Sequence, residues 1–221
     1  MHRSDVEYVG LLEDALALYS GNPVLERVKR LGRGALRPGM DVQEVTMLLT
    51  DIAAYTFPKS GCGPTEIVEW HRAYLAAIFD ATLSNGGFID SFLGESVISW
   101  FRRQDAVNAC RAALSAKTAV ENLIPLGKEN WPKVHIGQSI HVGMCQVGAD
   151  GTDKRLRFGI LGDSLNFARA IWQASKSTSL YPPVLSKEAF LMLSSAIDAR
   201  EESLSGYPPV YSLWGIRQSS V

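Results

Sequence analysis

Residues 86–101 read Gly-Gly-Phe-Ile-Asp-Ser-Phe-Leu-Gly-Glu-Ser-Val-Ile-Ser-Trp-Phe. Two runs rich in β-branched and aromatic residues, 88–92 and 96–101, flank the segment Leu93-Gly94-Glu95. Such runs on either side of a short glycine-containing loop are typical of an antiparallel hairpin. The stretch therefore predicts two paired strands, with the carboxylate of Glu95 at the tip of their turn.

Apolar residues at helical spacing predict a helix on each side of this hairpin, over 65–84 and from 104 to about 123. The apolar run 45–52 predicts a buried strand that closes on Asp51. The other predicted elements are strands over 134–147 and 155–161, a helix over 165–175, and a weaker terminal helix and strand. This order favours an α+β fold with helices on one face of a mainly antiparallel sheet.

The first forty residues differ from this pattern. Helices are predicted over 5–20 and 24–31, and glycines and prolines interrupt the chain over 32–39. The cations over 27–37 are typical of a solvated helix face, and the alternative is a contact for phosphates or a partner subunit. We expect an N-terminal helical extension with a basic linker over 1–40, a main domain over 41–215 and a tail over 216–221.

Composition excludes several classes of protein. The chain has 221 residues, of which 46% are hydrophobic and 20% are charged, so it can bury a core of ordinary size. A net charge of −1 argues against a nucleic-acid partner. Three widely spaced cysteines form neither a zinc pattern nor a disulfide framework. No apolar run reaches the roughly 18 residues of a membrane span, so we expect a cytoplasmic protein.

Two carboxylates fall near the ends of strands that we expect to be neighbours. Asp51 closes the first strand and Glu95 lies at the hairpin tip, so both can face one gap. Oxygen ligands of this kind suit Mg²⁺ or Mn²⁺, which commonly bind one or two carboxylates together with substrate phosphates. Acids at strand ends are also common without any function, so spacing alone leaves both interpretations open.

A glycine series of the form H-x-G-x4-G-x2-G runs from His141 to Gly151. Glycines at such positions permit a tight turn between strands or a close approach of two backbones. A single histidine in this setting is typical of a structural residue with satisfied hydrogen bonds.

Four ordered segments together resemble the catalytic domain of the class III nucleotidyl cyclases, the adenylyl and guanylyl cyclase family. The segments 49–56, 86–95, 141–151 and 161–168 resemble F-x-D-I-x-G-F-T, G-G-x-x-x-K-x-x-G-D, H-x-G-x4-G-x2-G and I-G-D-x-V-N-x-A. The resemblance covers about residues 43–214. It implies the ferredoxin-like, palm-type cyclase fold, in which a central sheet is flanked by helices. It also implies conversion of ATP or another nucleoside triphosphate to a 3′,5′-cyclic nucleotide and pyrophosphate.

The resemblance assigns roles to individual residues. Asp51 and Glu95 match the two metal-binding positions, and the carbonyl of Ile52 is a further metal ligand. A two-metal site for Mg²⁺ or Mn²⁺ is implied, and the longer Glu95 in place of aspartate suits Mn²⁺ better. Asn166 matches the asparagine that contacts the transition state.

Several positions depart from the family pattern. Ser91 stands where a lysine reads the base, and Gly159 stands where its acidic or threonine partner would be. The arginine expected four residues after Asn166 is Ala170, and Arg169 lies one place early, about 100° away on a helix. The lysine of the terminal strand aligns loosely with Ser205. Base selection by the usual pair is therefore absent, and two cations expected on the triphosphate are absent or displaced.

Three functional hypotheses stay open at this point. The first is an active nucleotidyl cyclase with an unusual nucleotide pocket, which includes a pyrimidine nucleotide cyclase. The second is a catalytically impaired nucleotide-binding domain that acts as a regulator or sensor. The third is an interaction module that uses the fold as a dimer scaffold. The resemblance implies a homodimer with active sites at its interface, and a heterodimer with a better-equipped partner is the alternative.

Overall fold

A computed structural model describes residues 3–56, 62–124, 128–176, 178, 181–203, 206 and 208–217, without the side chains of 3–7, 55 and 56. Ser205 lies outside the described residues. The chain forms two compact units. The smaller unit contains the chain up to Gln43 together with Gln146–Leu161, and the larger unit contains Glu44–Cys145 and Gly162–Val221.

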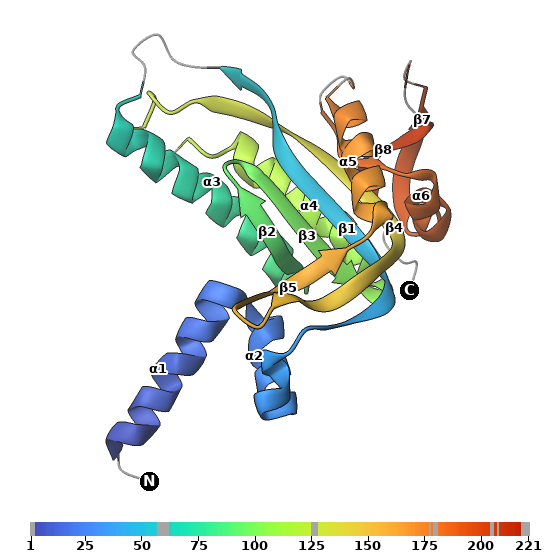
Figure 1. Ribbon diagram of the computed structural model, residues 1–221. Coiled ribbons are helices and arrows are strands. Elements are labelled where there is room, and N and C mark those ends of the chain that lie inside the picture. Colours follow the sequence, from blue (N-terminus) through green and yellow to red (C-terminus); the bar gives the residue numbers. More distant parts are fainter. Residues whose placement is uncertain are drawn as a thin grey trace. The chain divides into compact units, whose positions relative to one another are not determined.

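Helices and strands are interspersed along the described part of the chain (Figure 1). The helices are α1 Arg3–Ser20, α2 Asn22–Leu31, α3 Pro64–Ser84, α4 Ala106–Glu121, α5 Asp163–Ser175 and α6 Lys187–Leu193, with short 3₁₀ helices η1 Gly32–Leu36 and η2 Arg103–Asp105. The strands are β1 Gly39–Thr56, β2 Phe88–Leu93, β3 Ser96–Arg102, β4 Lys133–Thr152, β5 Arg155–Leu161, β6 Val184–Leu185, β7 Ile197–Glu202 and β8 Val210–Ile216. The predicted helices and the predicted hairpin are confirmed.

The strands form one sheet in the order β2-β3-β1-β4-β6-β8-β7, and β5 pairs with β4. The β1–β3, β2–β3, β4–β5, β6–β8 and β7–β8 pairs are antiparallel, whereas β4–β6 is parallel. The expectation of an α+β fold with a mainly antiparallel sheet is therefore confirmed. In the β1–β3 pair, Thr50 lies opposite Val97, which brings Asp51 beside the start of β3.

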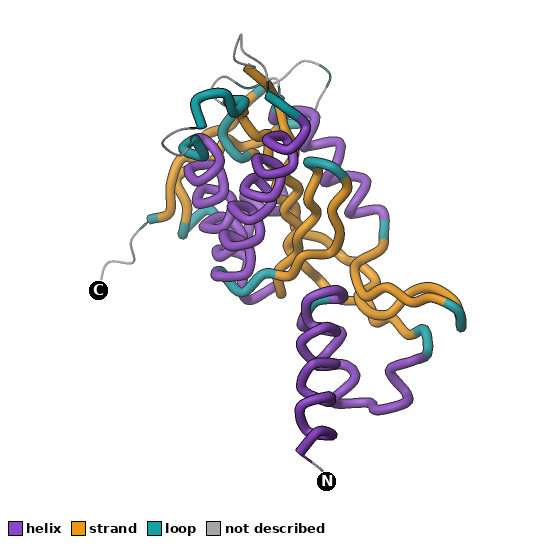
Figure 2. The backbone as a smooth tube through the Cα atoms, turned by 90° about the vertical axis from the view of Figure 1, so that its left-hand side faces the viewer, coloured by secondary structure: helices purple, strands orange, loops and turns teal. Residues whose placement is uncertain are grey.

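Helices cover both faces of the larger unit's sheet, which corrects the expectation of helices on one face (Figure 2). Alternation along β4 explains this arrangement, because successive side chains of a strand point to opposite faces. Ile136 and Ile140 lie in the core clusters with residues of α3 and α4. On the opposite face, the Ser139 hydroxyl donates to the Ala168 carbonyl of α5 at 2.8 Å. Side chains on both faces of β4 therefore contact helices, with α3 and α4 on one face and α5 on the other.

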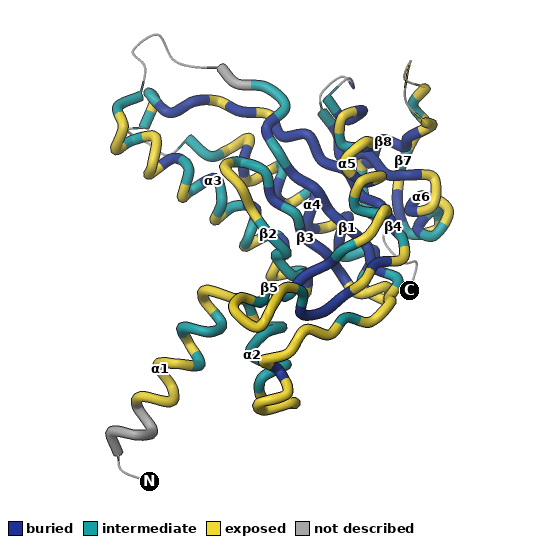
Figure 3. Tube along the Cα trace, in the orientation of Figure 1, coloured by how far each residue is buried: buried dark blue, intermediate teal, exposed yellow. Residues whose placement is uncertain are grey.

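The core of the larger unit follows from the spacing of apolar residues. Trp70, Tyr74 and Ile78 recur every fourth residue on α3 and are almost fully buried. The facing side of α4 is built largely from alanines, whose small size lets two helices pack closely against the sheet. Figure 3 shows the resulting burial along the central strands.

The strand β1 is longer than the sequence predicts, because it begins at Gly39 and continues to Thr56. Asp51 therefore lies within the strand instead of closing it. The neighbouring strand β4 is also long, with 20 residues. Backbone hydrogen bonds between strands do not depend on hydropathy, so the apolar run alone underestimates the length of β1.

The glycine series has the close backbone approaches that it predicted. In the smaller unit, Gly148 has φ +152°, and a Cβ there would lie 2.3 Å from the Gly39 carbonyl oxygen. Gly151 has φ +130°, and a Cβ there would lie 2.2 Å from the Arg155 carbonyl oxygen. Any side chain at either position would push two paired strands apart.

The N-terminal segment of the smaller unit forms the two predicted helices, and the predicted linker contains η1. Lys29 and Glu13 form an ion pair of 2.8 Å between α2 and α1. The Arg27 guanidinium donates to the Arg37 carbonyl at 3.0 Å, so part of the basic segment supports its own backbone.

Gly87→Ala should destabilise the larger unit by about 1–3 kcal/mol, because it overfills a packed core. A Cβ at Gly87 would lie 2.5 Å from the ring of Phe101, which is fully buried, and 2.8 Å from Thr82 Cγ2. The measurement is the midpoint of urea unfolding. Gly10→Ala in α1 is the control, because a Cβ there meets no atom within 4 Å. Equal midpoints for the wild type and Gly87→Ala would contradict this packing.

Candidate nucleotide and metal site

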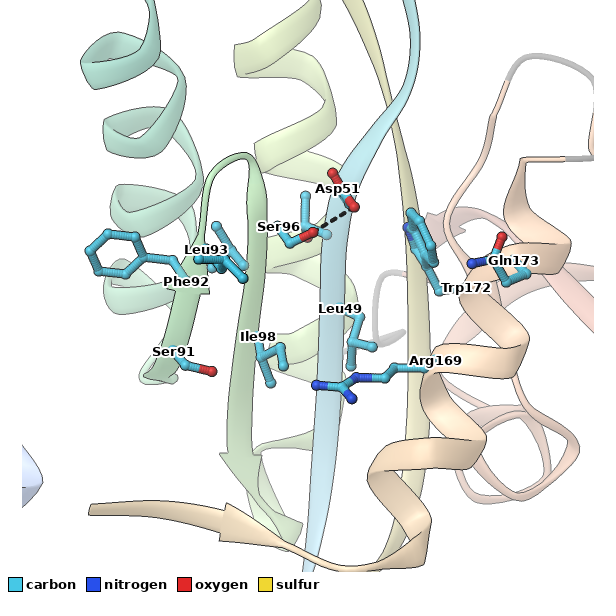
Figure 4. A pocket seen from close by; sticks show the side chains of 12 residues that line it. Leu49, Asp51, Ser91, Phe92, Leu93, Ser96, Ile98, Arg169, Trp172 and Gln173 are labelled. Atoms are coloured by element: carbon cyan, nitrogen blue, oxygen red, sulfur yellow. Dashed lines mark hydrogen bonds between the residues drawn. The ribbon is translucent and has the colours of Figure 1, made fainter. Parts of the chain in front are cut away.

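A pocket of about 410 Å³ lies in the larger unit on the face of the sheet that carries α5 (Figure 4). Strands β1, β2 and β3 and helix α5 supply its walls. The lining residues are Leu49, Thr50, Asp51, Ser91, Phe92, Leu93, Ser96, Val97, Ile98, Arg169, Trp172 and Gln173. The pocket therefore combines an apolar lining with one carboxylate and one guanidinium, which suits an anionic ligand with an apolar part.

Both oxygens of the Asp51 carboxylate accept hydrogen bonds. The Ile52 N–H donates to Oδ1 at 2.7 Å, and the Ser96 hydroxyl donates to Oδ2 at 2.5 Å (Figure 4). The next residue along the strand, Ile52, is 7% exposed and lies in a core cluster. The carboxylate is thus held in one orientation by a buried neighbour and by a donor on the adjacent strand.

Glu95 lies in the β2–β3 turn and is half-buried. The side chain of Ser96, the next residue, lines the pocket, whereas that of Glu95 is not among the lining side chains. The Glu95 carbonyl accepts a hydrogen bond of 2.9 Å from the Tyr74 hydroxyl. The predicted neighbourhood of β1 and the hairpin tip is confirmed, and Glu95 stands next to the hydroxyl that contacts Asp51.

The donor set fits a hard divalent cation. A carboxylate offers about four lone-pair directions, and Asp51 uses two of them for hydrogen bonds. The Ile52 carbonyl is the next oxygen along β1, and Glu95 precedes Ser96, whose hydroxyl contacts Asp51. The described part of the chain contains no group of three or more His, Cys, Asp or Glu side chains that could hold a metal by themselves. Mg²⁺ is commonly bound by one or two carboxylates together with substrate phosphates.

Helix α5 brings Arg169, not Ala170, to the pocket. Arg169, Trp172 and Gln173 are spaced i, i+3 and i+4, so they share one helix face. Figure 4 shows the Arg169 side chain extending from α5 towards Leu49 on β1. Ala170 and Asn166 are exposed, and neither is among the lining residues. Arg169 therefore lines the pocket although it lies one residue before the position at which the family pattern has its arginine.

The two predicted base-reading positions have different surroundings. Ser91 lines the pocket, and its hydroxyl donates to Asp90 Oδ2 at 2.8 Å. Asp90 itself lies in an irregularity of the β2–β3 pairing between Ile89 and Ser91. Gly159 lies on β5 in the smaller unit, opposite Gly148, and has no side chain to offer a base.

Ser96, Trp172 and Gln173 line the pocket and were not predicted from the sequence. A signal for Ser96 was present, because it alternates with the buried Val97 along β3 and so faces away from the core. Trp172 is oriented by a hydrogen bond of 3.1 Å from its indole N–H to the Gly137 carbonyl. That contact joins α5 to β4, and no local pattern predicts it.

His141 is a structural residue, as its sequence context favoured. The imidazole is buried, its Nδ1 lies 2.9 Å from the Ser186 hydroxyl oxygen, and its ring meets Phe167 edge-on at 4.9 Å. Burial lowers the pKa of His141, and the carboxylate of Glu188 opposes that shift. Ser186 also caps α6 by accepting from the Ala189 N–H, so His141 ties β4 to the start of that helix.

Known proteins resemble the chain in sequence and in fold. No protein-family model matches the chain. The adenylate cyclase of Anabaena cylindrica is 30% identical over 134 residues, which are 58% of this chain and 27% of the cyclase. A bacterial light-regulated adenylyl cyclase has a similar structure, with a TM-score of 0.79, 16% identity and coverage of 95% of this chain and 63% of that one. In sequence the chain is similar to adenylate cyclases, and its fold is that of adenylyl and guanylyl cyclase domains.

The chain also superposes on the guanylyl cyclase Cya2, with a TM-score of 0.66, 20% identity and coverage of 83% of this chain and 98% of that one. The chain spans only 27%, 6% and 21% of the lengths of three adenylate cyclases that it matches in sequence. Among its described helices, none has the length and apolar character needed to cross a membrane.

Acid should destabilise the wild type through His141. The folded-state pKa of His141 is lowered from 6.5, so the unfolded chain binds a proton at this residue more readily than the folded chain does. The free energy of unfolding is therefore unaffected by this group above about pH 6.5 and falls as the pH drops below that value. His141→Asn removes this proton uptake. Urea unfolding of both proteins between pH 8 and pH 5 should give curves that approach one another towards low pH. Parallel curves across this range would contradict a buried neutral imidazole.

Proposed function

We propose that the chain is a nucleotidyl cyclase that converts a nucleoside triphosphate to a 3′,5′-cyclic nucleotide and pyrophosphate. The observation that carries this proposal is that Asp51 on β1 and Arg169 on α5 line one pocket. A carboxylate for a cation and a guanidinium for phosphate in one pocket supply the two kinds of charge that a metal-bound triphosphate needs. The sequence relatives are adenylate cyclases, which supports the same reaction.

Asp51, the Ile52 carbonyl and Glu95 would hold Mg²⁺ or Mn²⁺, in a two-metal site as the resemblance implies. The cation, when bound, would favour ionisation of the 3′-hydroxyl and offset the charge of the triphosphate. Arg169 would contact phosphate oxygens, and its positive charge would stabilise the negative charge that develops as pyrophosphate leaves. Removal of one such donor commonly costs about 2.7–4 kcal/mol of transition-state stabilisation. The apolar walls, including Leu49 and Trp172, would limit the access of water.

Base selection should be loose. The Ser91 hydroxyl donates its proton to Asp90, which leaves an uncharged oxygen towards a base in place of a lysine. Gly159 supplies no side chain. Discrimination by one or two ordinary hydrogen bonds amounts to about 1–2 kcal/mol, so ATP, GTP, CTP and UTP should bind with affinities within this range.

The active form we propose is a homodimer with sites at its interface. Asn166 is exposed at the start of α5 and does not line the pocket of its own chain. A second copy that brings its Asn166 to the triphosphate would complete the site. A heterodimer with a partner that carries the missing lysine and arginine is the alternative.

A regulatory nucleotide-binding domain is the second candidate function. Gly159 and Ser91 lack the charged groups of the family pattern, which favours binding without efficient turnover. Product formation separates this candidate from an active cyclase, and the absence of any nucleotide binding would favour the dimer-scaffold hypothesis.

The test is formation of cyclic nucleotide by the purified chain, measured by mass spectrometry with four nucleotides and with Mg²⁺ or Mn²⁺. The wild type should form cyclic product, with Mn²⁺ the better cation. Asp51→Asn should abolish product, because its neutral amide cannot offset the charge of the cation. Asp198→Asn, outside the pocket-lining set, is the control. Binding without product in the wild type would favour the regulatory candidate.

Arg169→Ala should lower kcat about 100-fold while the nucleotide affinity changes little, because its contact strengthens mainly in the transition state. Ala170→Arg should leave kcat within about twofold of the wild type, because Ala170 does not line the pocket. Arg111→Ala on α4 controls for loss of a surface cation. An increase in kcat for Ala170→Arg would instead place the catalytic cation one residue later.

A further inference from the structure

Helix α3 holds the turn that carries Glu95 through two side chains. The Tyr74 hydroxyl donates to the Glu95 carbonyl at 2.9 Å, and His71 Nε2 lies 3.0 Å from the Gly94 carbonyl oxygen. The two residues lie three apart and so share one face of the helix. Two successive carbonyls of the β2–β3 turn are therefore bound to one helix.

The turn that joins β2 to β3 is exposed at Leu93 and Gly94. Gly94 has φ +58°, and the side chain of Leu93 is 87% exposed. On the other side of the turn, Ser96 reaches across to the carboxylate of Asp51. Glu95 thus lies between a hydrogen bond to β1 and hydrogen bonds to α3, and these contacts set where its backbone stands relative to Asp51.

Tyr74 is a rigid anchor for this purpose. Its side chain is fully buried, and its ring stacks on Trp70 with centroids 5.5 Å apart and an interplanar angle of 25°. The same core cluster contains Ile52, which follows Asp51, and Val97, which follows Ser96. One rigid group of side chains therefore supports both strands that supply the candidate metal ligands.

We infer that Tyr74 is a positioning residue for metal binding, because its hydroxyl fixes the backbone of Glu95, the residue before the Ser96 whose hydroxyl contacts Asp51. This inference rests on the proposed function, since it assigns the cation to Asp51 and Glu95. Without the hydroxyl, the Glu95 carbonyl loses this donor and the turn can shift. Groups that orient metal ligands in this way commonly change metal affinity 10–100-fold when removed.

The test measures binding of the Mn²⁺ complexes of α,β-methylene analogues of ATP, GTP, CTP and UTP by titration calorimetry. These analogues carry a methylene group in place of the oxygen between the α- and β-phosphorus, so pyrophosphate cannot leave. Tyr74→Phe should weaken binding about tenfold. Thr82→Val is the matched control, because it removes a buried hydroxyl of the same helix that lies 3.4 Å from the Ser99 hydroxyl, away from the turn. It should change the affinity less than twofold.

A double-mutant cycle with Glu95→Gln tests whether Tyr74 acts through Glu95. In that background Tyr74→Phe should have less than a twofold effect, because the positioned carboxylate is already gone. Urea unfolding of each variant monitors stability separately. The positioning role would be overturned if Tyr74→Phe left the affinity unchanged, or if it weakened binding equally in the wild type and in Glu95→Gln. In either case, loss of binding in Asp51→Asn would still support the proposed function. Failure of the wild type to bind any of the four complexes would overturn both.

Discussion

The antiparallel pairing of β1 with β3 is the constraint on which the site depends. Thr50 lies opposite Val97 in this pair, while Ile52 and Val97 are buried in one core cluster with Trp70 and Tyr74. A shift of one residue in this register would turn every side chain of a strand to the opposite face. It would expose Ile52 and bury Asp51, so the free energy of core burial also maintains the position of the carboxylate.

The hydrogen bond from Ser96 to Asp51 is a direct consequence of that register. It brings the first residue of β3 against the candidate metal ligand and places Glu95 one residue away. A carboxylate held by two donors does not have to be oriented when a cation arrives, so less conformational entropy is lost on binding. The apolar core on one face of the sheet thus fixes the strands that hold Asp51 and Ser96 on the other face.

The second half of the pocket depends on how closely α5 approaches β4. A Cβ at Gly137 would lie 2.5 Å from the Ser175 hydroxyl oxygen, and one at Gly143 would lie 2.5 Å from that of Ser164. These glycines leave room for the helix, and the Trp172 indole then reaches the Gly137 carbonyl. Arg169 belongs to the same helix face as Trp172, so its place in the pocket follows from backbone contacts on β4.

Sequence patterns alone predict the hairpin of residues 88–101 and the helices on either side of it, and they make Asp51 a candidate metal ligand. Those features follow from local periodicity, turn residues and the type of a single side chain. Only the tertiary structure decided that β1 extends beyond its apolar run, that α5 covers the second face of the sheet, and that Ser96 and Arg169 line the pocket. Each of these depends on contacts between segments far apart in the chain, such as β1 with β4 and α5 with β4. Local periodicity shows which side of a helix or strand is apolar. Which other element packs against that side depends on contacts across the whole sheet.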